Sequence, residues 1–169
     1  MSSTPQHPTE LSHINRAGDA SMVDVGAKPV TERFAQAEGF VRISEALETR
    51  IRENSLAKGS VFEVARVAGV LAAKRTDELI PLCHTLPLDG IDIAIDLEAR
   101  RVRVRASVHC HTRTGVEMEA LTAVTVACLT VIDMGKAVDR SMIIEGVRVL
   151  EKRGGRSGTY RADAPEAQA

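Results

Sequence analysis

Aromatic residues are scarce in this sequence, and tryptophan is absent. Three phenylalanines and one tyrosine are the only aromatic residues among 169, and they are too few and too scattered for the stacking platform of a single-strand nucleic-acid binder. The formal net charge is -1, so no overall field draws the chain toward nucleic acid or an anionic membrane. We therefore expect no nucleic-acid partner, and any anion that the chain binds must be held by a local group of cations.

Cysteines and long apolar runs are also few. Cys83, Cys110 and Cys128 form no CxxC pair and are odd in number, which favours neither a disulfide framework nor a structural zinc site and fits a reducing cytoplasm. The longest uncharged apolar run, 120–132, has 13 residues, whereas a transmembrane helix needs about 20. The first dozen residues lack the apolar centre of a signal peptide. We expect a cytoplasmic protein without a membrane span.

The length predicts about one domain. We expect a disordered tail at 1–11, a single α+β domain at 12–158 and a polar tail at 159–169, where glycine, proline and polar residues replace the periodic apolar pattern. The sequence contains no internal repeats.

Hydrophobic periodicity predicts a mixture of strands and helices. Strands are predicted at 39–44, at 91–97 and 102–110 as a hairpin, and at 141–152. Helices are predicted at 45–53, at 60–80 with Ser60 as the N-cap, and at 114–136. Because the hairpin is antiparallel and no regular βαβ alternation occurs, we expect an α+β fold with the helices on one face of an antiparallel sheet.

The predicted helix at 114–136 is apolar along its length but charged at both ends. Glu117 and Glu119 stand at its start, and Asp133 and Lys136 at its end. On one helix Glu119 and Asp133 would lie within about 40° of the same face but about 21 Å apart, so they cannot serve one small site within one chain. Two antiparallel copies would join the two ends into one shared site. The alternative is that these charges only complement the helix dipole.

Spacing leaves the role of the other polar residues open. Asp133 and Lys136 are three positions apart, which suits a surface ion pair or a proton-transfer couple. His84 in the sequence IPLCH is either a general acid or base or a solvated loop histidine. The segment KRGGRSG, 152–158, has glycines and cations that could hold a phosphate, although its spacing is not that of a Walker A loop.

The sequence HCH at 109–111 suggests a metal site only at first sight. In a strand His109 and His111 lie on one face and Cys110 on the other, so the three cannot converge on one ion. We expect no metal site.

Four segments resemble, in order and spacing, the cyclic pyranopterin monophosphate synthase family of molybdenum cofactor biosynthesis, the MoaC family. They are MVDVGAKP, KGSVFEVARVAGVLAAKRTDELIPLCH, TGVEMEALTAVTVACLTVIDMGKAVD and KRGGRSG, and the resemblance runs from about Ser12 to Gly158. It implies a ferredoxin-like fold and a homohexamer, a trimer of dimers with active sites at the dimer interface. It also implies a lyase that converts 3′,8-cyclo-7,8-dihydro-GTP, supplied by a radical-SAM GTP cyclase, into cyclic pyranopterin monophosphate and pyrophosphate.

The resemblance also implies functional residues. It places acid–base groups at Asp133, Lys136, Lys58 and His84, with Asp133 and Lys136 as the central pair. It places substrate-binding residues at Leu82, Cys83, His84, Glu117, Met118, Glu119, Lys152 and Arg156. Cations would stabilise the leaving pyrophosphate. We expect no required cofactor, and Mg²⁺ on the pyrophosphate stays open as an alternative.

Two interpretations of a different class stay open beside this one. A nucleotide-binding module without catalysis would need the glycines and arginines of 152–158 but would gain little from Asp133 and Lys136. A structural oligomer, whose charges only cap helices, would have no affinity for anions. The segment HTRTG at 111–115 departs from the family pattern, which leaves 111–113 without an implied role.

Overall fold

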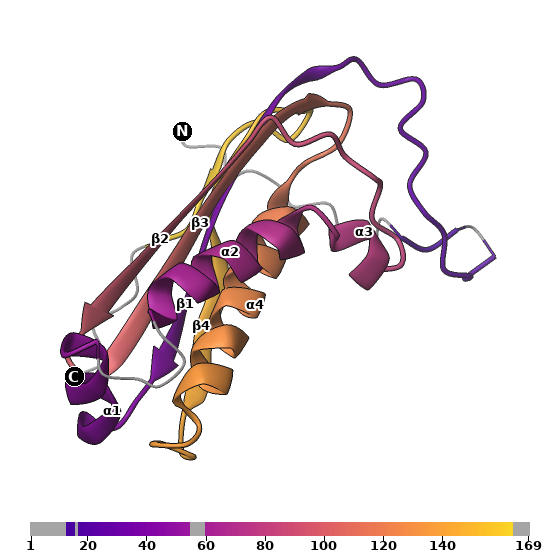
Figure 1. Ribbon diagram of the computed structural model, residues 1–169. Coiled ribbons are helices and arrows are strands. Elements are labelled where there is room, and N and C mark those ends of the chain that lie inside the picture. Colours follow the sequence, from indigo (N-terminus) through magenta and orange to yellow (C-terminus); the bar gives the residue numbers. More distant parts are fainter. Residues whose placement is uncertain (1–12, 16, 55–59, 164–169) are drawn as a thin grey trace.

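The computed structural model, which describes residues 13–15, 17–54 and 60–163, contains one antiparallel sheet with helices packed against one of its faces (Figure 1). The strands are β1 (Thr31–Arg42), β2 (Gly90–Glu98), β3 (Arg101–Thr112), β4 (Ile143–Arg153) and β5 (Tyr160–Arg161), in the order β2-β3-β1-β4-β5. The helices are α1 (Glu45–Arg52), α2 (Val61–Ala73), α3 (Thr76–Leu79) and α4 (Glu117–Gly135). The expected α+β class is confirmed.

The chain order and the sheet order together define the topology. The first four strands and their helices run β1, α1 to α3, β2, β3, α4, β4, and β3 lies between β1 and β2 while β1 lies between β3 and β4. A parallel pair separated by an antiparallel strand is the split βαβ unit of ferredoxin-like folds. The short strand β5 adds a fifth position beside β4.

The hydrophobic core lies between the sheet and the helices α2 and α4. Inward positions of β1 are small, and Ala35 and Ala37 are fully buried. Gly39 lies directly below α4, because a Cβ there would be 2.7 Å from Cγ1 of Val124. Gly69 similarly lets α2 approach α4, since its Cβ would stand 3.0 Å from the carbonyl oxygen of Ala123. These small residues bring α4 close to the sheet and to α2.

Helix α4 is, within the described part of the chain, the one helix long and apolar enough to cross a membrane by length and composition. More than half of it is buried against β1, β3, β4 and α2, which is the packing of a core helix. Its outward side still carries large apolar side chains, and Leu129 is 51% exposed.

Several element boundaries differ from the sequence-based expectation. The N-cap is confirmed, because the Ser60 hydroxyl accepts a hydrogen bond from the Glu63 backbone N–H at 3.5 Å. The single helix predicted at 60–80 is wrong, since Arg75 leaves the helical region with φ -123° and ψ 21° and α3 begins separately at Thr76. Strand β1 starts at Thr31 rather than at residue 39. Residues 159–169, expected as a tail, contribute Tyr160 and Arg161 to the sheet.

A buried acid lies in the part of β1 that the sequence-based prediction missed. Glu38 points away from the helices, is 3% exposed, and is held by Arg103 at 2.6 Å and by Arg148 at 2.9 Å. Its two partners come from β3 and β4, the neighbours of β1 in the sheet. The outer face of the sheet is therefore stabilised by charge pairing rather than by apolar contacts.

Candidate active site

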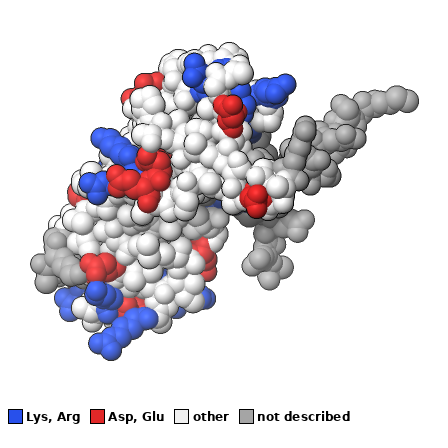
Figure 2. Space-filling model, turned by 90° about the vertical axis from the view of Figure 1, so that its right-hand side faces the viewer, with Lys and Arg blue, Asp and Glu red and all other residues white. Residues whose placement is uncertain are grey.

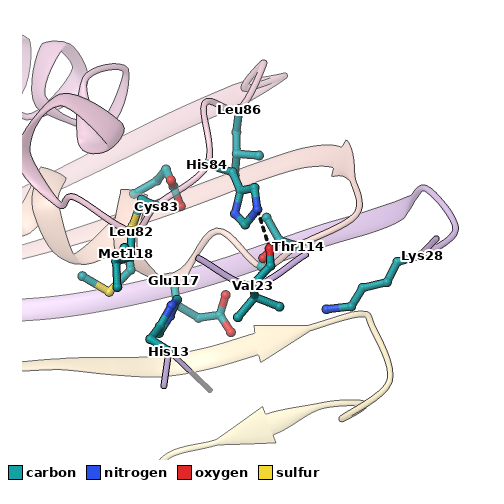
Figure 3. Close-up of a pocket in the computed structure, with 12 residues that line it drawn as sticks. His13, Val23, Lys28, Leu82, Cys83, His84, Leu86, Thr114, Glu117 and Met118 are labelled. Carbon is teal, nitrogen blue, oxygen red and sulfur yellow. Dashed lines mark hydrogen bonds between the residues drawn. The ribbon is translucent and has the colours of Figure 1, made fainter. Parts of the chain in front are cut away.

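A pocket of about 390 Å³ opens at the N-terminal end of α4 (Figure 3). Its walls come from three segments that are distant in sequence, namely the loop before β1, the loop after α3 and the first turn of α4. All six substrate-binding residues expected in the last two segments line it: Leu82, Cys83, His84, Glu117, Met118 and Glu119. The fold thus brings the PLCH and VEME sequences to one cavity.

A hydrogen bond to the N-terminal loop orients His84. Its Nε2 lies 2.9 Å from the carbonyl oxygen of Val23 (Figure 3). Since a carbonyl oxygen can only accept, Nε2 must carry the proton, and Nδ1 is then the basic nitrogen of the ring. The contact also ties the loop before β1 to the loop after α3, and so closes one wall of the pocket.

Glu119 is the buried acid of the pocket. Its side chain belongs to the first turn of α4 and is 4% exposed. Burial raises the pKa of the Glu119 carboxyl to about 7, and the nearby carboxylates of Glu117 and Asp77 act in the same direction. A carboxyl with such a pKa can accept or donate a proton near neutral pH, as general acid–base catalysis requires.

The thiol of Cys83 lies in the same wall but has a different character. Burial raises the pKa of Cys83, and the charges of Glu119 and Asp77 raise it further. The group is therefore a neutral thiol at physiological pH and not an activated nucleophile.

Asp133 and Lys136 occupy the opposite end of α4. The Lys136 ammonium lies 2.6 Å from the Asp133 carboxylate, and both side chains are more than half exposed. A hollow of about 450 Å³ lies beside them, lined in part by Asp139 and Arg140. Because α4 has 19 residues, and each adds about 1.5 Å, its two ends are separated by roughly 28 Å. One chain does not bring this pair to the pocket.

The remaining expected residues fall in two places. Lys152 lies near the end of β4, and its ammonium donates a hydrogen bond to the Ser157 hydroxyl across the glycine-rich turn. Arg156 is exposed in that turn. Lys58 lies outside the described residues.

Two pocket residues with basic side chains were not singled out from the sequence. His13 and Lys28 both line the cavity, and Figure 3 shows the Lys28 side chain extending toward it from the loop before β1. Neither belongs to a periodic element, so no spacing rule identifies them. Lys28 supplies a cation to a pocket that otherwise contains two carboxylates.

The side chains of the HCH sequence lie on the two faces of β3 as strand geometry predicts. His109 and His111 are exposed on the outer face of β3, and Cys110 is fully buried on the inner face. His111 pairs with Asp89 at 2.9 Å through Nδ1. Across the described residues no group of three or more potential ligands could hold a metal ion.

Comparison with known proteins shows the family to which this chain belongs. A model of the MoaC family matches residues 22–155. A protein of Thermomicrobium roseum named cyclic pyranopterin monophosphate synthase is 52% identical over 161 residues, covering 94% of this chain and 97% of its own. A protein of the same name from Parvibaculum lavamentivorans is 52% identical over 155 residues, which cover 90% of this chain and 97% of its own. Another from Brucella ovis is 51% identical over 158 residues, which cover 92% of this chain and 96% of its own. The family match includes the pocket loop, both ends of α4 and the start of the glycine-rich turn.

Proposed function

Since this chain belongs to the MoaC family, we propose that it is a cyclic pyranopterin monophosphate synthase of molybdenum cofactor biosynthesis, the activity for which its relatives are named. Its substrate is then 3′,8-cyclo-7,8-dihydro-GTP, delivered by a radical-SAM GTP cyclase, and it works in the cytoplasm. The observation that supports the proposal is the pocket at the start of α4, which six of the residues expected to bind substrate line together, although they come from two separate motifs.

The reaction requires two kinds of chemistry. The ring system must be opened and reclosed by transfers of protons to and from carbon and nitrogen. The cyclic phosphate forms when a sugar hydroxyl bonds to the α-phosphorus, the bond from that phosphorus to the bridging oxygen breaks, and pyrophosphate leaves. The first kind needs acids and bases with pKa values near neutrality, and the second needs cations around the departing phosphates.

We propose that two chains build each site. The outward side of α4 carries an apolar stripe that runs from Met118, which lines the pocket, to Leu129, one turn before Asp133. Figure 2 shows the helical face of the molecule, where charged side chains gather in separate groups around an uncharged middle. A second copy packed on this stripe with its α4 antiparallel would cover apolar surface and place Asp133 and Lys136 of one chain at the pocket of the other. Three such dimers would form the proposed hexamer.

In the assembled site, proton transfer and pyrophosphate binding are assigned to different residues. Asp133 and Lys136 form the central proton-transfer pair, and covering their 2.6 Å contact with a second chain removes water that now screens it. Glu119 provides a further group that exchanges protons near neutral pH, and His84 is a further general acid or base in this proposal. Lys58 is a further acid in this proposal. Lys152 and Arg156 face the pyrophosphate.

Catalysis can be separated from binding by one substitution. Asp133→Asn keeps the size of the side chain but cannot accept a proton, so pyrophosphate and pterin should form with the wild type and not with the variant, while both bind substrate. Asp92→Asn, on the exposed outer face of β2, is the matched control and should keep full turnover. If the wild type bound substrate tightly but released neither product, the chain would be a binding module. An Asp133→Asn variant with unchanged turnover would remove this residue from the central pair.

We propose that no cofactor is required, although Mg²⁺ could assist the leaving pyrophosphate. Turnover in the presence of a chelator should then persist. Complete loss of activity in EDTA, restored by Mg²⁺, would show that the metal is needed.

A further inference from the structure

Asp77, in the single turn of α3, is a carboxylate that belongs neither to the proposed acid–base set nor to the proposed substrate-binding set. Its Oδ2 accepts a hydrogen bond from the Thr85 hydroxyl at 2.5 Å. The two residues are eight positions apart, and the PLCH loop (residues 81–84), which supplies three of the pocket residues, lies between them. The contact therefore ties the far end of the PLCH loop back to α3.

Helix α3 is itself fixed to the end of α2. Thr76 is buried, and its hydroxyl donates a hydrogen bond to the carbonyl oxygen of Ala73 at 3.1 Å. Backbone hydrogen bonds then continue into the loop, because Ile80 N–H donates to the carbonyl oxygen of Thr76 at 2.8 Å and Cys83 N–H donates to that of Ile80 at 3.0 Å. A charged acceptor on α3 therefore holds the loop from a fixed position.

The PLCH loop is anchored at two successive residues. The ring of His84 bonds to the carbonyl oxygen of Val23 (Figure 3), and the hydroxyl of the next residue, Thr85, bonds to Asp77. Neither Asp77 nor Thr85 is among the described residues that line the pocket, whereas the residues on both sides of Thr85, His84 and Leu86, line it. The contact can therefore act on a substrate only through the residues that it holds in place.

The charge of Asp77 also acts on the buried acid of the pocket. Helix α3 contacts α4, and burial, then the charge of Glu117, then that of Asp77 raise the pKa of Glu119. The charge of Asp77 acts in the same direction on the pKa of Cys83, after burial and Glu119. The other titratable or charged groups that face Glu119 come from α4, from the loops that line the pocket and from β3, and they are Glu117, Cys83, His84, His13, Lys28 and Cys110.

We propose that Asp77 is a positioning residue of the active site, which holds the PLCH loop through Thr85 and keeps a negative charge near Glu119. The hydrogen bond keeps the loop in the arrangement that accepts substrate, so binding has less ordering to impose. The charge disfavours a second carboxylate nearby, so Glu119 keeps its proton to a higher pH. The inference rests on the proposed function, because it concerns the same pocket.

Three substitutions separate the hydrogen bond from the charge. Thr85→Val removes the donor and keeps the charge, Asp77→Asn removes the charge and keeps an acceptor oxygen, and Asp77→Ala removes both. Thr85→Val and Asp77→Ala should raise the KM for 3′,8-cyclo-7,8-dihydro-GTP roughly 2- to 10-fold, which corresponds to one net hydrogen bond. Asp77→Asn should restore the KM to within about twofold of the wild type, and kcat of Thr85→Val should change less than about twofold.

The effect of the charge is measured without turnover. The protonated Glu119 carboxyl has an infrared C=O band, which is assigned by its absence in Glu119→Gln, and the titration of this band gives the pKa. In Asp77→Asn the pKa of Glu119 should lie below that of the wild type, and in Thr85→Val it should not change. Glu78→Gln removes the same charge from the next, exposed residue of α3. This matched control should change neither the KM nor the titration.

Either of two results would overturn the inference: an unchanged KM in Thr85→Val, or a Glu119 titration that is the same in Asp77→Asn and the wild type. If Asp77→Ala fails to fold, Thr85→Val and Asp77→Asn, which keep the size of the side chains, decide alone. If the wild type makes no pterin, calorimetric affinity for the same nucleotide replaces the KM. Changed affinity and titration without pterin would then refute the proposed function alone, and an active enzyme indifferent to all three substitutions would refute this inference alone.

Discussion

The two ends of α4 lead to a prediction about activity in mixed oligomers. Glu119 and Asp133 lie 14 residues apart on one helix, which separates them by about 21 Å. In the proposed shared site, each complete site takes Glu119 from one chain and Asp133 from another. Glu119→Gln and Asp133→Asn should each be inactive alone. A dimer that contains one chain of each kind has one site with both substitutions and one site with neither.

The recovered activity can be calculated from random assembly. When the two inactive proteins are unfolded, mixed in equal amounts and refolded together, about half of the dimers are mixed and each has one intact site of two, so roughly a quarter of wild-type activity should return. Wild type refolded with the double variant Glu119→Gln/Asp133→Asn should fall to about a quarter of its activity, because every mixed dimer loses both sites. Sites contained within one chain would leave about half.

The assay is release of pyrophosphate from 3′,8-cyclo-7,8-dihydro-GTP, normalised to the concentration of folded protein. Each single variant refolded by itself is the control for reactivation by refolding. No activity in the mixture of single variants, together with half-activity in the mixture with the double variant, would refute the shared site.

Three further predictions concern assembly, pH and stability. Leu129→Asp places a charge on the exposed apolar stripe of α4, so sedimentation should show smaller species and turnover should be lost; an intact, active oligomer would contradict the proposed interface. Burial raises the pKa of Glu119 from 4.5 to about 7. As the pH rises, the unfolded chain therefore loses the Glu119 proton at a lower pH than the folded chain does. The free energy of unfolding of the wild type should decrease between about pH 5 and 7, by up to roughly 3 kcal/mol, and that of Glu119→Gln should not. Equal pH profiles in urea denaturation would contradict that burial. Glu38→Gln removes the carboxylate shared by Arg103 and Arg148 and should lower the free energy of unfolding by roughly 1–3 kcal/mol without changing turnover per folded chain; a change below about 0.5 kcal/mol would show that the pairing is not needed for stability.

The long helix and the hairpin could be predicted from local pattern alone. The composition of α4 would suit a strand as well as a helix, but its 19 residues are too many for a typical strand and favour a helix. The alternation at 91–97 and 102–110 identifies β2 and β3 directly. The two strands alternate buried and outward residues, so their period is visible without knowledge of their partners, whereas α4 is predicted from its length.

The first half of β1 and part of the site could not be predicted in this way. Arg33 and Glu38 are both buried, yet each is charged, and their contacts come from β3, β4 and the glycine-rich turn. Such polar contacts are made between segments distant in sequence and leave no period. Lys28 reaches the pocket because the loop before β1 is anchored by the hydrogen bond from His84 to Val23. A tertiary contact of this kind has no signal in the spacing of residues.

The charges at the two ends of α4 are predictable, but their meaning depends on assembly. Within one chain Asp133 and Lys136 form an exposed ion pair, which has little effect on stability. Glu119, in contrast, is buried with its pKa near 7. A stabilising cap would not need a buried acid, so the geometry at the start of α4 favours chemistry over capping.

The most direct test is the stoichiometry of the two products. Purified protein is incubated with 3′,8-cyclo-7,8-dihydro-GTP, and pyrophosphate and oxidised fluorescent pterin are quantified in the same samples over time. A synthase of this family should release one pyrophosphate for each pterin formed, at the same rate, with the cyclic phosphate visible by phosphorus NMR. Pyrophosphate without pterin, or neither product despite bound substrate, would contradict the assignment of this chain as a cyclic pyranopterin monophosphate synthase.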